Sequence, residues 1–269
     1  MPNNASISSN NLYVGRGKVY VDRWANGAPS GYYRFLGNVE KIDGAFSVST
    51  IEKKSSMDGA SSLIAQAIVG SEAEISMTWS EFSAANLADA LLGTKSTWTQ
   101  SSGTATAAVL GSAKLGYAIP TGKRKITVTS VVKTSGSVTL VAASSLGGVG
   151  DYWVDTDAGL IYIFDTPSTA GLVDGDALTW NGSYPAITAS DMVTALSNGD
   201  VTMSVLYVPA SDQVSGPRHE VRIPRWRPNA DGNLSLISDE FGTITVKGKA
   251  LKDSTQAAGQ EFWTMRKLN

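Results

Sequence analysis

The side chains that could carry chemistry are few in this sequence, and their spacing fits no common site. The single histidine, His219, has no second histidine and no cysteine with which it could hold a metal ion. Asp155 and Asp157 match the start of a calcium loop, but its third oxygen ligand, its glycine and its final glutamate are all missing. The glycines of residues 15–18 precede a strand pattern rather than a helix, so they do not indicate a phosphate loop. We therefore expect no metal and no cofactor.

Two pairs of neighbouring acids, Glu72 with Glu74 and Asp239 with Glu240, could serve a carboxylate-dependent glycosidase. Nothing in the sequence brings two acids to one cleft, and solvated strand edges explain both pairs. No G-x-S-x-G nucleophile motif occurs. The sequence predicts a protein that is not an enzyme, with a glycosidase as an alternative to test.

The composition narrows the possible classes of protein further. Of 269 residues, 42% are hydrophobic, which is enough for a core, and 17% are charged, which is typical of chains that hide surface in an oligomer. The net charge of −2 gives no general attraction to nucleic acid. The chain has no cysteine, no signal-peptide pattern in MPNNASISSN and no apolar run near the ~20 residues of a membrane span. We expect a cytoplasmic protein with no membrane partner.

Residues 46–93 are the most informative part of the chain. Two alternating strand patterns flank a polar stretch, residues 52–62, which has no apolar period and is expected to be an exposed loop. The second pattern leads into a short helix, with Ser83 as its N-cap and Gly93 at the C′ position. The apolar face of this helix is expected to contain Leu87, Ala90 and Leu91. So short a helix needs a sheet to pack on.

Nearly all the rest of the chain is predicted as β structure or turns. Residues 1–12 are rich in Asn and Ser and are expected to be a mobile arm, and residues 94–113 a loop or linker. Residues 114–185 show short strands at close spacing, with hairpin turns between them. Strand patterns follow after residue 186, interrupted by a Pro/Asn/Gly loop at 226–234. The expected fold class is mainly β with one short helix.

One basic cluster in the last quarter of the chain is a candidate interface. On a strand, Arg218 and Arg222 share a face, whereas Arg225 points to the other. A sequence pI of 5.5 and the lack of interleaved aromatic residues argue against a nucleic-acid patch, whereas salt bridges to a neighbouring subunit fit. Trp226 could anchor such a contact or belong to the core, and the sequence favours neither.

Five segments follow one another in a recognisable order. They are GRGKVYVDRW, FLGNVEKIDGAFSVSTIEKKSSMDG, AEISMTWSEFSAANLADALLG, DYWVDTDAGLIYIFD and ISDEFGTITVKGKALKD. In this order of elements the chain resembles the major tail protein, or tail tube protein, of long-tailed, non-contractile bacteriophages. The resemblance covers most of the chain as a pattern and rests on no single motif.

The resemblance implies a fold. It is a tail-tube-type β-sandwich of two sheets with one short flanking α-helix, formed here by residues 13–96 and 186–269. Residues 97–185 would be an added β-rich insertion or an elaborated edge of the sandwich.

The resemblance also implies a function. Subunits of this family close into hexameric rings, and the rings stack into a hollow tail tube through which genomic double-stranded DNA passes without sequence-specific binding. The partners would be further copies of the chain, the tape measure protein, the tail terminator and the distal tail proteins. The protein would be assembled in the host cytoplasm and reside in the virion.

The resemblance places contacts as well. In the family, a long loop between two strands reaches the next ring, and residues 52–62 occupy its place here. The residues expected to contact the adjacent ring are Glu52, Lys53, Lys54, Met57 and Asp58. The candidates for an interface between subunits are Arg218, Arg222, Arg225 and Trp226.

Two other functions stay open at this point. Seven Trp and nine Tyr could supply a stacking surface for sugars, as in a carbohydrate-binding or adhesin-like β-sandwich. The tube fold is also used in contractile tails and in related injection machines, and the sequence does not separate these from non-contractile tails.

Overall fold

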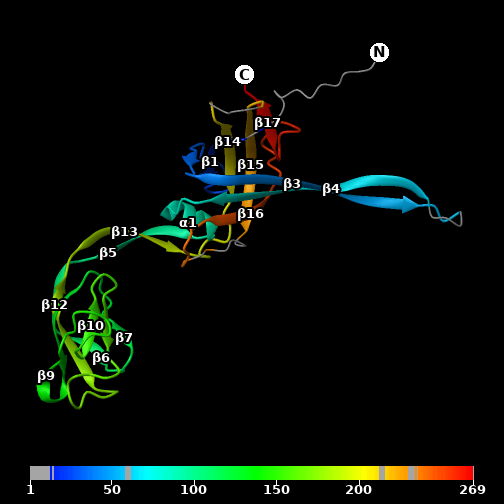
Figure 1. Cartoon of the computed structure of the whole chain (residues 1–269). Helices are drawn as coiled ribbons and strands as arrows, with labels where there is room; N and C mark the ends of the chain where they lie inside the picture. The colour runs from blue at the N-terminus through cyan, green and yellow to red at the C-terminus, as the bar shows by residue number, and fades with distance from the viewer. Residues whose placement is uncertain are drawn as a thin grey trace. The chain divides into compact units, whose positions relative to one another are not determined.

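A computed structural model describes residues 13, 15–57, 62–211, 216–229, 234 and 236–268. These residues form antiparallel sheets with one α-helix among them, so the prediction of a mainly β fold is confirmed. The chain divides into two compact units, one of Met1–Ser96 with Met192–Asn269 and the other of Thr97–Asp191 (Figure 1). The mobile arm expected at residues 1–12 lies outside the described residues.

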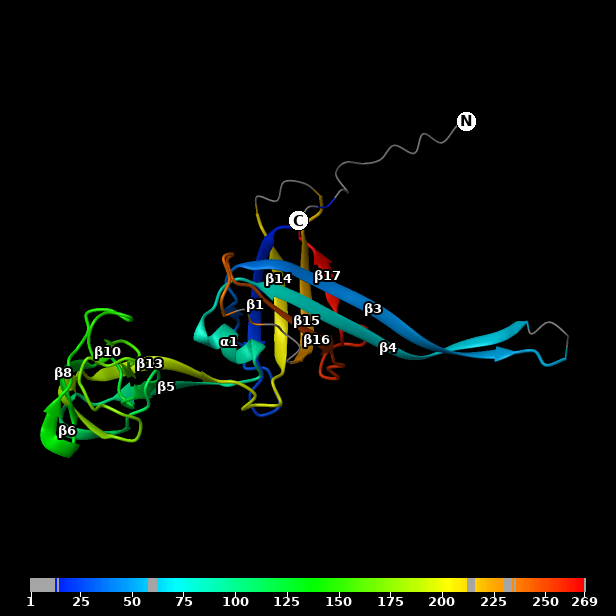
Figure 2. The ribbon, with the colours of Figure 1, turned by 60° about the horizontal axis from the view of Figure 1, so that its bottom comes forward.

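The first unit has one continuous sheet in the order β2-β1-β14-β15-β16-β4-β3, with β17 paired to β15 beside this path. Its strands are β1 (Gly17–Arg23), β2 (Arg34–Phe35), β3 (Val39–Lys54), β4 (Leu63–Trp79), β14 (Met203–Pro209), β15 (His219–Asn229), β16 (Ile244–Ala250) and β17 (Thr264–Lys267), and its helix is α1 (Ala84–Ala90). β15 belongs to both halves of the sheet, because its first part pairs with β14 and β17 and its last four residues pair with β16. The sheet thereby folds over on itself, and β3 and β4 cross β1, β14 and β15 in both views (Figures 1 and 2).

The core of the first unit lies between the two halves of this sheet. Alternation along β16 turns Ile244 and Val246 inward, where they join buried side chains of β1, β4, β14 and β15 in one cluster. Trp79 and Trp226 are fully buried and are the largest members of this cluster. Complete burial of large apolar side chains stabilises a fold by roughly 1.5–3 kcal/mol each, so this cluster holds the two halves together.

Helix α1 begins as predicted, with the Ser83 hydroxyl capping its first turn. Its C-terminal end differs by one residue from the prediction. Leu92, rather than Gly93, takes the left-handed conformation (φ 46°), and the Gly93 amide donates to the Ala88 carbonyl at 2.7 Å. Gly93 is required for a different reason, since a Cβ at this position would lie 2.4 Å from the Thr194 carbonyl oxygen.

Several strands are longer than their local sequence predicts. Glu52, Lys53 and Lys54 continue β3 opposite β4, so the expected loop at 52–62 was too long at its start. Cross-strand pairing outweighs the low strand propensity of these charged residues. β15 continues to Asn229, into the loop expected at 226–234, of which residues 230–233 lie outside the described part.

The second unit contains a four-stranded sheet, β6-β12-β8-β9, and a three-stranded sheet, β10-β11-β7. Its elements are β6 (Gly103–Ser112), β7 (Ala118–Pro120), β8 (Thr127–Lys133), the 3-10 turn η2 (Ser135–Ser137), β9 (Val138–Thr139), β10 (Tyr152–Asp155), β11 (Leu160–Ile163) and β12 (Ala177–Tyr184). β5 (Thr94–Gln100) and β13 (Ile187–Thr194) pair in a separate two-stranded sheet. The loop expected at 94–113 is therefore wrong, because its Thr- and Ala-rich residues find strand partners in β13 and β12.

A buried carboxylate organises the loops of the second unit. Asp151 is 0% exposed and accepts hydrogen bonds from the Val141 amide, the Thr169 amide and the Thr169 hydroxyl, all at 2.6 Å. These bonds tie two other stretches of chain to the Asp151 side chain, so the carboxylate is a structural acceptor.

We predict that Asp151→Asn lowers the free energy of unfolding by about 2 kcal/mol, because the amide group turns a donor toward at least one of these donors. Urea unfolding followed by tryptophan fluorescence measures the loss. The matched control is Asp157→Asn, an exposed position where we expect a change within about 0.5 kcal/mol. Equal midpoints for the two variants would contradict the structural role of Asp151.

Candidate functional site

The outer half of the β3–β4 hairpin extends away from the core of the first unit (Figures 1 and 2). We call this part, residues 46–71, the arm. Its two strands pair only with each other, and nearly all of its described residues are exposed. Val48, Ile51 and Ile68 are 61%, 62% and 70% exposed. A two-stranded hairpin is marginally stable alone in water, and exposed apolar side chains of this number mark an interaction surface.

One face of the arm continues the core face of the hairpin. The cross-strand pairs on this face, from the core outward, are Ile42–Met77, Gly44–Ile75, Phe46–Ala73 and Val48–Ser71. Met77 and Ile75 are fully buried, whereas Phe46 and Val48 are mostly exposed. The apolar pattern therefore continues past the point where the chain supplies its own second layer.

The base of the arm borders a groove of about 510 Å³. Trp263 packs edge-on against Phe46 there, with 5.3 Å between ring centroids. The groove also includes Val39, Ile42 and the exposed Met265. This apolar lining can receive side chains from another molecule.

β3 also presents an unpaired sheet edge. It is the last strand in the sheet order, so one side of its 16-residue backbone has no strand partner among the described residues. The other end of the order is β2, which has only two residues. A long open edge tends to pair with another chain unless it is covered.

The residues expected to contact a neighbouring ring lie near the outer end of the arm, whose described residues 51–57 we call the arm tip. Glu52, Lys53 and Lys54 are exposed at the end of β3, and Met57 is 92% exposed just beyond it. No ion pair joins either lysine to another residue that the structure describes. Asp58 lies outside the described residues.

The second predicted group does not form one surface. Arg222 is exposed on β15, and the side chain of Arg218 is half-buried. Arg225 lies over the ring of Trp24, with its guanidinium carbon 5.1 Å from the ring centroid. Trp226 is 0% exposed and belongs to the core, so its assignment as an interface anchor is withdrawn. A bulge in the pairing of β14 with β15 interrupts the regular alternation of side chains between Ile223 and Trp226, so simple alternation does not give their faces correctly.

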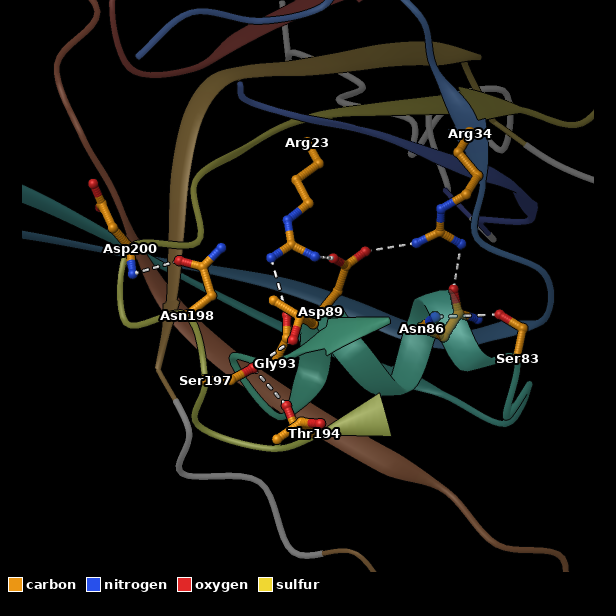
Figure 3. A network of polar contacts seen from close by, with 11 residues as sticks. Arg23, Arg34, Ser83, Asn86, Asp89, Gly93, Thr194, Ser197, Asn198 and Asp200 are labelled. Atoms are coloured by element: carbon orange, nitrogen blue, oxygen red, sulfur yellow. Dashed lines mark hydrogen bonds and ion pairs between the residues drawn. The ribbon is translucent and has the colours of Figure 1, made fainter. Parts of the chain in front are cut away.

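A polar network that was not predicted surrounds α1 (Figure 3). The carboxylate of Asp89, 4% exposed, accepts from Arg23 at 3.1 Å and from Arg34 at 2.6 Å. Arg34 also donates to the Asn86 side chain, and Arg23 to the Gly93 carbonyl at 3.1 Å. The network ties α1 to β1 and β2. It lies beside the predicted apolar face, of which Ala90 is buried in the core cluster, Leu87 packs against that cluster and Leu91 is half-buried.

The chemistry of this network is structural. Burial raises the pKa of Asp89 above its ordinary value, and the charges and hydrogen bonds of Arg34 and Arg23 offset part of that rise. Every polar group of the carboxylate has a partner from the same chain, and the two arginines also have partners on α1 or just after it. The network therefore fixes the helix on the sheet edge.

The other side chains that could carry chemistry make ordinary structural contacts. Asp155 accepts from the Ala158 amide at 2.9 Å in the turn between β10 and β11. Glu72 pairs with Lys249 at 2.8 Å. His219 starts β15, opposite Lys267. Within the described ranges, no three His, Asp or Glu side chains gather as a metal site would require.

No helix in the described part of the chain has the length and apolar character needed to cross a membrane.

Residues 12–262 match the model of a family described as protein of unknown function UCP028589. A search of curated proteins finds no match.

Proposed function

We propose that this chain, which belongs to the family of unknown function UCP028589, is a structural subunit that assembles with copies of itself into rings and tubes. The observation that carries the proposal is the arm: a hairpin that leaves the core and exposes several apolar side chains, among them Phe46, Val48 and Ile68. In a chain that functions alone, such an exposed apolar surface would lower the solubility, whereas a chain that assembles covers the surface with a neighbouring subunit.

Three further features support assembly. The long edge of β3 has no strand partner among the described residues, the groove beside Phe46 and Trp263 is mostly apolar, and Lys53 and Lys54 have no ion-pair partner within the described chain. None of these features supplies a reacting group. Together they favour an interaction protein over an enzyme.

In this proposal the folded-over sheet of the first unit is the two-layer sandwich of a tail tube protein, with α1 on its flank. The second unit is the β-rich addition carried by each subunit. The subunit is that of a phage tail, with the tape measure, terminator and distal tail proteins as partners and the virion as its location.

The charge of the chain suits a conduit for DNA. A net charge of −2 on each subunit does not attract phosphate, so a duplex can slide through a tube of such subunits. If six subunits each contribute four strands tilted by ~40°, the barrel is about 50 Å wide and leaves a bore of about 40 Å. A duplex of about 20 Å fits this bore.

Negative-stain electron microscopy of the concentrated full-length protein tests the proposal. We expect rings or tubes with a central hole of about 40 Å, and light scattering should show multiples of the subunit mass. A protein that stays monomeric under all conditions, including with tail partners present, would overturn the proposal.

A further inference from the structure

A second exposed apolar segment lies far from the arm tip. Residues 236–241 precede β16, and Leu236 and Phe241 are 85% and 98% exposed. Between them stand two exposed acids, Asp239 and Glu240. The segment therefore combines apolar side chains with adjacent negative charges, a combination that a solvated loop does not need.

A groove adjoins this segment. It has a volume of about 370 Å³ and is lined by Asn38, Glu40, Ser80, Phe82, Phe241 and Gly242. The ring of Phe82 lies directly over Gly242, where a Cβ would be 2.9 Å from it. The segment thus adjoins a recess with two aromatic rings, Phe82 and Phe241, and with one more carboxylate, Glu40, at its wall.

The arm tip has the complementary composition. Its apolar side chains include Ile51 and Met57, and between them stand the adjacent cations Lys53 and Lys54. Glu52 precedes the lysines, and Asp58 follows Met57 in the sequence. Two neighbouring lysines between apolar side chains match two neighbouring acids between apolar side chains.

These two surfaces lie at opposite ends of the same hairpin. Ile244, the first residue of β16, pairs with Trp79 at the inner end of β4, whereas Lys54 pairs with Leu63 at the outer end. β4 has 17 residues, so its ends are about 50 Å apart at ~3.3 Å per residue. Phe241 is three residues from Ile244 and stays within about 10 Å of it. The arm tip therefore does not reach the segment of its own chain.

We propose that the arm tip of one copy docks on residues 236–241 of a second copy. The inference rests on the proposed function and names the surface that receives the arm. Lys53, which shares a face of β3 with Ile51, faces Asp239 and Glu240, and Lys54 lies beside it at the end of the strand, while Met57 and Ile51 meet Leu236, Phe241 and the recess beside Phe82. Because the contacting surfaces differ, the contact is heterologous and repeats from copy to copy in one direction.

A charge exchange tests the contact in the full-length protein. Lys53→Glu with Lys54→Glu, and separately Asp239→Lys with Glu240→Lys, should each lower the assembled fraction about tenfold at moderate salt. The combination of all four changes should restore assembly to within about threefold of the original protein. Assembly that is unaffected by reversal of the acids, or not restored in the combination, would overturn the contact.

Cysteine trapping gives a second measurement that does not need a stable assembly. The chain has no cysteine, so Lys54→Cys and Glu240→Cys introduce single thiols, and mixing the two variants under mild oxidation reports their encounter. We expect mixed dimers at least about tenfold faster than with the control Ser102→Cys, an exposed position between β5 and β6. A rate equal to the control refutes the contact.

The two tests separate the inference from the proposed function. If rings form equally well in all charge variants, the proposed structural function still holds and the proposed contact is wrong. If mixed disulfides form but the protein makes no rings or tubes, the proposed contact holds and the ring-forming function is wrong.

Discussion

Removing the outer part of the arm is expected to abolish assembly and to leave the subunit folded. The variant replaces residues 50–69 with Asn-Gly, which joins the paired residues Ser49 and Gly70 through a two-residue hairpin turn. The association constant should fall by about 30- to 700-fold, because losing a cluster of contact residues costs ~2–4 kcal/mol and each tenfold change is 1.4 kcal/mol. Light scattering and electron microscopy measure the loss.

The fold should survive this change because the excised residues add almost nothing to the core. Apart from Ser55, which is half-buried, the described residues from 50 to 69 are exposed. The pairing of β4 with β16 begins only at Ala73, inward of the cut. Circular dichroism and the unfolding midpoint should therefore stay close to those of the intact chain, within about 1 kcal/mol.

A pair of single substitutions provides the matched control. Ile68→Ser removes an apolar side chain that is 70% exposed on the arm, and Val109→Ser removes one that is 84% exposed in the second unit. We expect only the arm variant to weaken assembly. If the shortened chain assembles as the intact chain does, or if both serine variants behave alike, the arm is not the contact surface.

Removing both arginines from Asp89 is expected to be the most destabilising change in the first unit. The double variant Arg23→Met with Arg34→Met leaves the carboxylate of Asp89 buried without a cation. Leaving one member of a buried ion pair without its partner lowers the free energy of unfolding by about 3–5 kcal/mol. Asp89→Asn should cost less, because the two arginines are about a third exposed and can turn to water.

The penalty should depend on pH with a defined sign. Burial raises the pKa of Asp89 in the folded chain, so the group holds its proton more strongly when folded than when unfolded. The stability that protonation supplies is complete below the ordinary pKa of 3.8 and is lost as pH rises through the folded value. Loss of both arginines removes the charges that offset this rise, so the pKa of Asp89 rises further and the double variant should be less destabilised, relative to the original protein, at pH 4 than at pH 7.

Urea unfolding at the two pH values measures this effect, and two variants control it. Adding Asp89→Asn to the double variant should recover stability at pH 7, since it removes the stranded charge. Lys41→Met breaks the exposed pair with Asp43 and should change stability by no more than about 1 kcal/mol. A double variant that is no less stable than Lys41→Met would contradict the role of the network.

Local signals in the sequence predicted local structure well. The Ser83 hydroxyl caps α1 as predicted, and one of the strand patterns expected after residue 186 becomes β16. The turn before Leu160 contains Gly159 in the left-handed conformation, with φ 67°. Each of these features depends on residues within a few positions of one another.

Features that depend on distant partners were missed. Arg34 and Arg23 are 55 and 66 residues from Asp89, so the sequence does not show that an acid on the helix has cations beside it. Trp226 sits among charged residues, but the bend of β15 between two halves of the sheet buries it. Side-chain periodicity alone does not contain these long-range pairings.

The arm was missed for a related reason. Gly44 and Gly70 lie within strands although glycine has a low strand propensity, and Gly44 leaves room for Trp263, which a Cβ would approach to 3.2 Å. The resulting strands of 16 and 17 residues are about three times the usual length. Their excess length, rather than any motif, is the signal that they reach beyond their own core.

The register of β4 has a mechanical consequence. Its inner residues bond to β16 at seven successive positions, from Ala73 opposite Ala250 to Trp79 opposite Ile244. A tensile load applied along the protruding hairpin runs parallel to these strands, so it strains the whole row of bonds in shear instead of opening them one after another like a zipper. A filament whose units grip one another by such hairpins would resist stretching along that direction until an entire strand slips.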